Sequence, residues 1–203
     1  IHEQNYFEAG QGEVKGAVFL PGDKGFITAG EGKENKEDTL QMWNLAGKKE
    51  VSLKGLKGDL LSGVNAVSVG GNAQNPVIAS AGVDGTVRLW DKSGKEIKQL
   101  LAEGKPNYDS FTAIAVSSDG QKIIAGKGNG TVYLWDNKSG KQLKTWVAHE
   151  NKVTAISFSK NGQTLATAGE DGLARIWTVT GNKQGELKHP QIKKMLGVSL
   201  SPD

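Results

Sequence analysis

The chain has 203 residues, and its 25 lysines and arginines nearly balance its 22 aspartates and glutamates, leaving a net charge of +3. Because this small charge is spread along the chain, the sequence lacks the basic stripe of a nucleic-acid-binding protein. The absence of cysteine excludes disulfides and thiolate chemistry, and neither a membrane-spanning apolar run nor a signal-peptide pattern is present. We therefore expect a cytoplasmic protein with no nucleic-acid or membrane partner.

In chain order, the first repeating unit covers approximately residues 10–55. Two strands are predicted where "FITAG" and "TLQMW" stand, and the second ends at Trp43. The segment between them, "GEGKENKED" at residues 30–38, is too charged for a core, so we expect a solvated loop inserted in place of a tight turn.

The next three units are approximately residues 60–103, 107–148 and 149–190, and they share the same order of strands and turns. An apolar strand such as "VTAISF" leads through a polar turn to a second strand such as "TLATAG". A glycine turn then precedes a strand of alternating apolar and polar residues that ends in tryptophan, and a more polar fourth strand follows. Alternation with period two is typical of half-buried strands, so each unit is predicted to be four antiparallel strands.

The glycine turns carry the strongest hairpin signal in the chain. They are Asp84-Gly85, Asn129-Gly130 and Asp171-Gly172. Such pairs favour two-residue loops of type I′, in which both central residues have positive φ. We therefore expect tight type I′ hairpins at these three places.

Residues 191–203 contain "MLGVSLSPD", which matches the first strand of a further unit. The chain also starts with isoleucine rather than methionine. We therefore expect a partial fifth unit, and a chain that is part of a longer protein or that associates to cover its exposed faces.

Four tryptophans, 42 to 47 residues apart, give the chain a resemblance to a known family. With Trp90-Asp91 and Trp135-Asp136 it resembles the WD40-repeat β-propellers, whose blades are four-stranded sheets with this period. Trp43-Asn44 and Trp177-Thr178 depart from the signature at the second position. The resemblance implies an all-β propeller over residues 1–203, with about four and a half blades. The repeat style is most similar to bacterial, especially cyanobacterial, domains of this family.

The resemblance also implies a buried hydrogen-bond network in each blade, joining a histidine, a serine or threonine, the turn aspartate and the tryptophan. In the fourth repeat these are His149, Thr167, Asp171 and Trp177. The second repeat keeps Ser80, Asp84 and Trp90 but has Leu60 at the histidine position. Beside Trp135 the third has Asn107, Ala125 and Asn129, so we expect a less rigid blade there; the first repeat contributes Trp43.

Interpretations of single motifs as phosphate-binding or metal-binding sites have little support in the sequence. "GKGNGTV" at residues 126–132 resembles a glycine-rich phosphate loop, but no helix follows it and the partner motifs of a kinase are missing, so a hairpin turn is favoured. No two histidines have metal-ligand spacing. We therefore predict no catalytic residue, metal or cofactor.

The resemblance implies a non-enzymatic scaffold or sensor, part of a larger signalling protein, that binds a protein or peptide on its loop face. The residues expected there mix an aromatic ring with both charges, as interfaces do. They are Val83, Tyr108, Asp109, Lys127, Gly128, Glu150, Lys152 and Glu170. Tyr108 is the predicted anchor, with packing over the blade edge as the alternative. The alternative function is a small-molecule-binding or catalytic propeller that uses its central channel.

Overall fold

The computed structural model describes residues 11–22, 24–32, 39–53, 63–102, 109–188 and 191–201, and within these ranges the secondary structure is sixteen β-strands. They form four sheets of four antiparallel strands, each in chain order from its innermost strand outward. The predicted all-β propeller architecture is confirmed. The sheets are called the first to the fourth below.

The first sheet contains β1 (Gln11–Phe19), β2 (Phe26–Gly32), β3 (Leu40–Trp43) and β4 (Lys49–Ser52). The second contains β5 (Val64–Gly71), β6 (Pro76–Gly82), β7 (Val87–Trp90) and β8 (Glu96–Leu100). The third contains β9 (Phe111–Val116), β10 (Lys122–Lys127), β11 (Thr131–Asp136) and β12 (Gln142–Val147). The fourth contains β13 (Val153–Phe158), β14 (Thr164–Gly169), β15 (Leu173–Thr178) and β16 (Lys183–Lys188).

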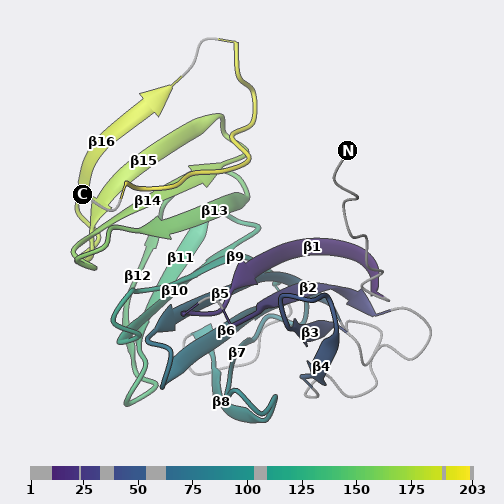
Figure 1. Cartoon of the computed structure of the whole chain (residues 1–203). Coiled ribbons are helices and arrows are strands. Elements are labelled where there is room, and N and C mark those ends of the chain that lie inside the picture. Colours follow the sequence, from purple (N-terminus) through teal and green to yellow (C-terminus); the bar gives the residue numbers. More distant parts are fainter. Residues whose placement is uncertain are drawn as a thin grey trace.

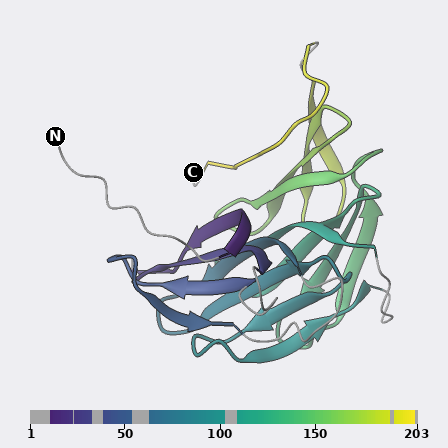
Figure 2. The ribbon, with the colours of Figure 1, turned by 90° about the vertical axis from the view of Figure 1, so that its right-hand side faces the viewer.

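The sheets are arranged as an open arc, with the first and fourth sheets at its two ends (Figures 1 and 2). Each sheet packs on the next mainly through the innermost strands β1, β5, β9 and β13. Residues 191–201 continue beyond β16 as an extended segment that returns along the fourth sheet (Figure 1).

Apolar side chains on both faces of each inner sheet explain this stacking. On β6, Ile78 packs toward the first sheet, whereas its neighbour Ala79 packs toward the third. Successive side chains of a strand point to opposite faces, so a sheet enclosed on both sides needs apolar residues at consecutive positions. The core is thus three layers, one between each pair of consecutive sheets.

The hairpin turns differ from the predicted type I′ form. In the second sheet the amide of Gly85 donates to the carbonyl of Gly82, and the amide of Gly82 donates to Thr86, which leaves a three-residue loop. Gly85 has a φ of 76°, while the Asp84 carboxylate accepts the amide of Thr86 at 3.1 Å. Because the aspartate side chain closes the turn itself, the loop is a three-residue turn ending in a left-handed glycine.

Candidate functional site

The fourth sheet joins four side chains beneath its hairpin turn. His149 Nδ1 lies 2.9 Å from the carboxylate of Asp171, and its Nε2 lies 2.8 Å from the hydroxyl of Thr167. That hydroxyl also accepts the indole N–H of Trp177 at 2.9 Å. The guanidinium of Arg175 also lies 2.8 Å from Nδ1, so the buried imidazole contacts a carboxylate and a cation on one side and a hydroxyl on the other. The chain of bonds links the rim to the sheet interior.

Electrostatics hold this group in one charge state. Burial lowers the pKa of His149, and the nearby Arg175 lowers it further, against the opposing effect of Asp171. Burial alone would raise the pKa of Asp171, but hydrogen bonds from Arg175 and His149 outweigh it and lower the value to about 2. The group therefore contains a neutral imidazole beside an ionised carboxylate at neutral pH.

In the second sheet an arginine pairs with the turn aspartate, as Arg175 pairs with Asp171 in the fourth sheet. Trp90 donates to Ser80 at 2.9 Å, and Arg88 pairs with Asp84 at 2.6 Å. Thr86 donates both its amide and its hydroxyl to the same carboxylate. These bonds lower the pKa of Asp84 against the effect of burial, which would raise it. The predicted gap at Leu60 lies outside the described residues.

The third sheet uses a different solution. Ala125 stands at the serine or threonine position, and Trp135 donates to the carbonyl of Leu101 at 3.4 Å. Lys127 occupies the position of Gly82 and Gly169 in the neighbouring sheets. Its ammonium lies 5.0 Å from the ring of Phe111 and 5.2 Å from that of Tyr133, so cation–π contacts fill the space that the histidine fills in the fourth sheet.

This packing corrects the prediction that Lys127 belongs to a partner-binding rim. Its side chain is 0% exposed, because it turns inward over the two aromatic rings instead of outward from the hairpin. A partner that approaches the rim meets the turn residues Gly128 and Asn129, which are exposed.

The first sheet contains a bond that the sequence pattern missed. Trp43 donates to the hydroxyl of Thr28 at 2.9 Å, the same contact that Trp90 makes with Ser80. In the second and fourth sheets the hydroxyl residue precedes the tryptophan by ten residues, whereas here the inserted loop separates the pair by fifteen. Counting strand residues rather than chain positions would have found Thr28.

The remaining rim residues lie around the hairpin turns. Asp109, Glu150 and Lys152 are exposed, and Val83 is half-buried. Glu170 forms an ion pair with Lys194 at 3.3 Å. Tyr108, the predicted anchor, lies outside the described residues. The structure thus places charges of both signs on the rim, without describing the aromatic residue expected among them.

The rim backbone is held by the buried groups below it. The amide of Glu150 donates to the Asp171 carboxylate at 3.3 Å, and the amide of Glu170 donates to the carbonyl of Lys152 at 2.9 Å. The exposed side chains of the fourth sheet therefore project from a backbone whose position is fixed, which lowers the entropic cost of binding.

A cavity of about 290 Å³ lies near the inner strands at the opposite ends of β9 and β13, and it is lined by several serines. Its hydroxyl groups bond the protein itself: Ser118 donates to the carbonyl of Lys160 at 2.5 Å, and Ser68 accepts the amide of Val116 at 3.0 Å. Among the described residues no group of three or more histidine, cysteine or acidic side chains could hold a metal ion. The same part of the chain contains no helix long and apolar enough to cross a membrane.

Comparison with known proteins places this geometry in a family. Residues 51–177 match the family model of the Vps8 beta-propeller. The small ribosomal subunit protein RACK1 of Neurospora crassa is 34% identical over 87 residues, 43% of this chain and 27% of that protein. MST50-interacting protein 11 of Pyricularia oryzae is 33% identical over the same shares of the two chains. Cross-pathway control WD-repeat protein 2 of Flammulina velutipes is 35% identical over 80 residues, 39% of this chain and 24% of its own. The aligned part thus spans about a quarter of each relative.

Proposed function

Because this chain belongs to the WD40-repeat β-propeller family, we propose that it is a non-enzymatic scaffold that binds a protein or peptide on its hairpin rim. The binding role belongs to a larger signalling protein in the cytoplasm of a bacterium. The bacterial and signalling parts rest on the repeat style, and the cytoplasmic part on the absence of cysteine; the relatives named above come from fungi.

One observation supports the rim most strongly: exposed charged side chains stand on a backbone that buried side chains fix. Glu150 and Lys152 flank the loop whose amide and carbonyl groups bond Asp171 and Glu170. Charges of both signs suit the polar border of a protein interface, whereas a phosphate site would need cations alone. One of the fungal relatives is named for its interaction with another protein, and we extend only that general role to this chain.

The alternative of a channel-based binder or enzyme is less well supported. The serine hydroxyls near the inner strands form hydrogen bonds with backbone groups of the neighbouring sheet. They therefore hold consecutive sheets together. His149 and Asp171 have the residue types of a general base and its orienting group, but the third member of their group is Thr167, which bonds Trp177. A hydroxyl committed to that contact is poorly placed as a nucleophile.

The test is a quantitative affinity capture from a bacterial lysate, with the wild-type chain and a charge-reversed rim variant as baits. We expect the double variant Glu150→Lys, Lys152→Glu to lose the proteins that the wild type captures. Lys138→Glu, an exposed change in the turn between β11 and β12, is the matched control and keeps them. Equal capture by all three baits would contradict docking on the rim.

Tyr108 is tested separately, since its surroundings are not described. If it anchors the partner, Tyr108→Ala weakens binding of a captured partner by at least about tenfold, while stability changes by no more than about 0.5 kcal/mol, as for surface changes. A large loss of thermal stability would instead make it a packing residue.

A further inference from the structure

Asparagine precedes glycine at only two places in the sequence, Asn129-Gly130 and Asn161-Gly162. The first pair lies in the hairpin turn between β10 and β11, and the second lies in the turn between β13 and β14. Both asparagines are exposed. An asparagine side chain can react with the main-chain nitrogen of the next residue, and glycine obstructs this reaction least because it has no Cβ. The two turns are therefore the places in the chain where such a reaction meets the least hindrance.

The turn at Asn129 brings the reacting groups together and holds each of them by one bond. Oδ1 of Asn129 accepts the amide of Thr131 at 3.0 Å, so the side chain folds forward past the intervening nitrogen of Gly130. That nitrogen donates to the carbonyl of Lys127 at 3.2 Å, at the long end of the range for such bonds. In the part of the chain that the structure describes, Oδ1 has no second partner.

The turn at Asn161 holds the same groups more tightly. Its Oδ1 accepts both the hydroxyl of Ser159 at 2.8 Å and the amide of Gln163 at 3.0 Å. The amide of Gly162 donates to the carbonyl of Ser159 at 2.9 Å, a shorter bond than that of Gly130. The reaction requires that the side chain rotate and that the glycine amide lose its proton. The structure therefore distinguishes two turns that are alike in sequence.

We propose that Asn129 is a site of spontaneous modification, at which water replaces the side-chain amide by way of a cyclic imide. Hydroxide removes the amide proton of Gly130, and the nitrogen attacks Cγ of Asn129. A bond forms between this nitrogen and Cγ, while the bond from Cγ to Nδ2 breaks and Nδ2 leaves as ammonia with a proton from water. Water then opens the imide. Cleavage at Cγ gives aspartate, whereas cleavage at the main-chain carbonyl carbon gives isoaspartate.

The aspartate product would keep the turn intact. Asp84 stands at the corresponding position of the second sheet and accepts the amide two residues further on, as Asn129 does. Arg88 pairs with Asp84, whereas the third sheet has Tyr133 at the position of this arginine. An aspartate at position 129 would therefore lack the arginine partner and add a negative charge to the exposed rim.

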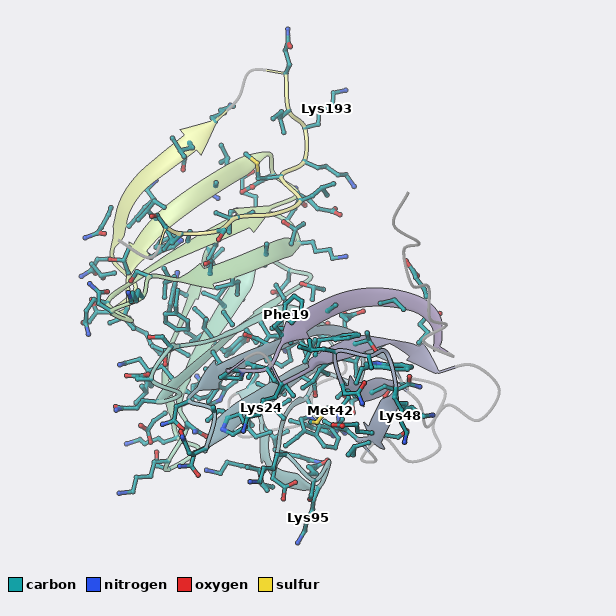
Figure 3. All side chains as sticks on the ribbon, in the orientation of Figure 1. Phe19, Lys24, Met42, Lys48, Lys95 and Lys193 are labelled. Carbon is teal, nitrogen blue, oxygen red and sulfur yellow. The ribbon has the colours of Figure 1, made fainter. Side chains whose placement is uncertain are left out.

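The isoaspartate product would disturb the contact between the third and fourth sheets, because it lengthens the main chain by one methylene directly before Gly130. The carbonyl of Gly130 accepts the amides of Ala148 at 2.9 Å and His149 at 3.1 Å. Gly172, the corresponding glycine of the fourth sheet, likewise lies against the chain that follows, since an added Cβ would lie 3.3 Å from Lys193, which Figure 3 labels. A shift of Gly130 would therefore displace the segment that leads into the buried His149.

Incubation of the 203-residue chain at neutral and at mildly alkaline pH, followed by peptide mapping with mass spectrometry, tests the proposal. The peptide that contains Asn129 should gain the mass difference between an amide and a carboxyl group, and its two products should separate by chromatography. We expect Asn129 to react about fivefold faster than Asn161 in the folded chain, since one more hydrogen bond of ordinary strength has to break at Asn161. Both rates should rise at alkaline pH, because hydroxide removes the glycine proton.

The same measurement on the chain unfolded in guanidinium chloride isolates the effect of the fold, and there the two asparagines should react at similar rates. Asn129→Ser has no amide to lose and should show no modification at this position. The proposal is overturned if Asn129 stays unmodified in the folded chain, or if folding does not make it the faster of the two sites.

The melting temperature separates the effects of the two products. Asn129→Asp reproduces the first product and should melt within about 2 °C of the wild type, as for an ordinary surface change. Chains enriched in isoaspartate at position 129 by ion exchange should melt below both. An isoaspartate form that melts like the wild type would contradict the displacement of Gly130.

Discussion

Replacement of His149 by alanine tests how the fourth sheet is held together. The imidazole is buried and bonds Asp171 at 2.9 Å and Thr167 at 2.8 Å. A hydrogen bond to a charged group contributes about 1.5 to 3 kcal/mol and one between neutral groups about 1 kcal/mol. Asp171 keeps its contact with Arg175 at 2.7 Å, and Thr167 keeps its bond from Trp177, so neither is left unpaired. Because both groups keep other partners, we expect only part of this total of about 2.5 to 4 kcal/mol to be lost, and the free energy of unfolding to fall by about 1 to 3 kcal/mol.

The assay is urea unfolding at pH 7, followed by tryptophan fluorescence, with Asn151→Ala as an exposed control in the same loop. A chain of this size loses about 2 to 4 °C in melting temperature per kcal/mol, so His149→Ala should melt roughly 2 to 12 °C below the wild type, and the control within about 1 °C. The structural reasoning is refuted if His149→Ala unfolds like the wild type yet loses the binding of a captured partner.

Further predictions concern charge, the buried lysine and a turn. His149 has a folded pKa below its ordinary 6.5 and Asp171 one of about 2 against an ordinary 3.8, so protons bind the unfolded chain more strongly at both. Stability should fall as the pH drops below about 6.5 and again between about 3.8 and 2, and urea midpoints measured at a series of pH values would show both steps. Lys127→Met should preserve most of the stability, because the flexible apolar methionine side chain can fill the same space over the two aromatic rings. Lys127→Glu should lower the melting temperature far more. Gly130→Ala should destabilise by at least about 1 kcal/mol, because φ is 84° and the added Cβ would lie 1.8 Å from the carbonyl oxygen of His149; Gly128→Ala, with no atom within 4 Å of its added Cβ, should change the urea midpoint little.

The fold could be predicted because its strands and turns are encoded locally. Alternation ending at Trp90, Trp135 and Trp177 specified the third strand of the second, third and fourth sheets, and glycines specified the turns. The turn type was wrong, because the pattern of Asp-Gly does not show whether the aspartate backbone or its side chain closes the loop. In the structure the side chain of Asp84 accepts the amide of Thr86.

The candidate site was harder to predict, since it depends on contacts between strands. Lys127 follows the second strand in the sequence and has the residue type of a rim cation, yet Phe111 and Tyr133 draw it inward. That inward position requires Tyr133 to replace the arginine found at the same place in the second and fourth sheets, a substitution visible only when the repeats are aligned. The bond from Trp43 to Thr28 was hidden by the inserted loop for a similar reason.

Hydrogen–deuterium exchange of the chain with and without a captured partner tests the central claim, binding at the rim, most directly. Amides of the rim segments at residues 150–152 and 170–172 should become protected in the complex. Those at residues 118–121 and 160–163, in turns at the opposite ends of the strands, should exchange at unchanged rates. Protection confined to residues 118–121 and 160–163 would contradict the account and favour binding near the serine-lined cavity.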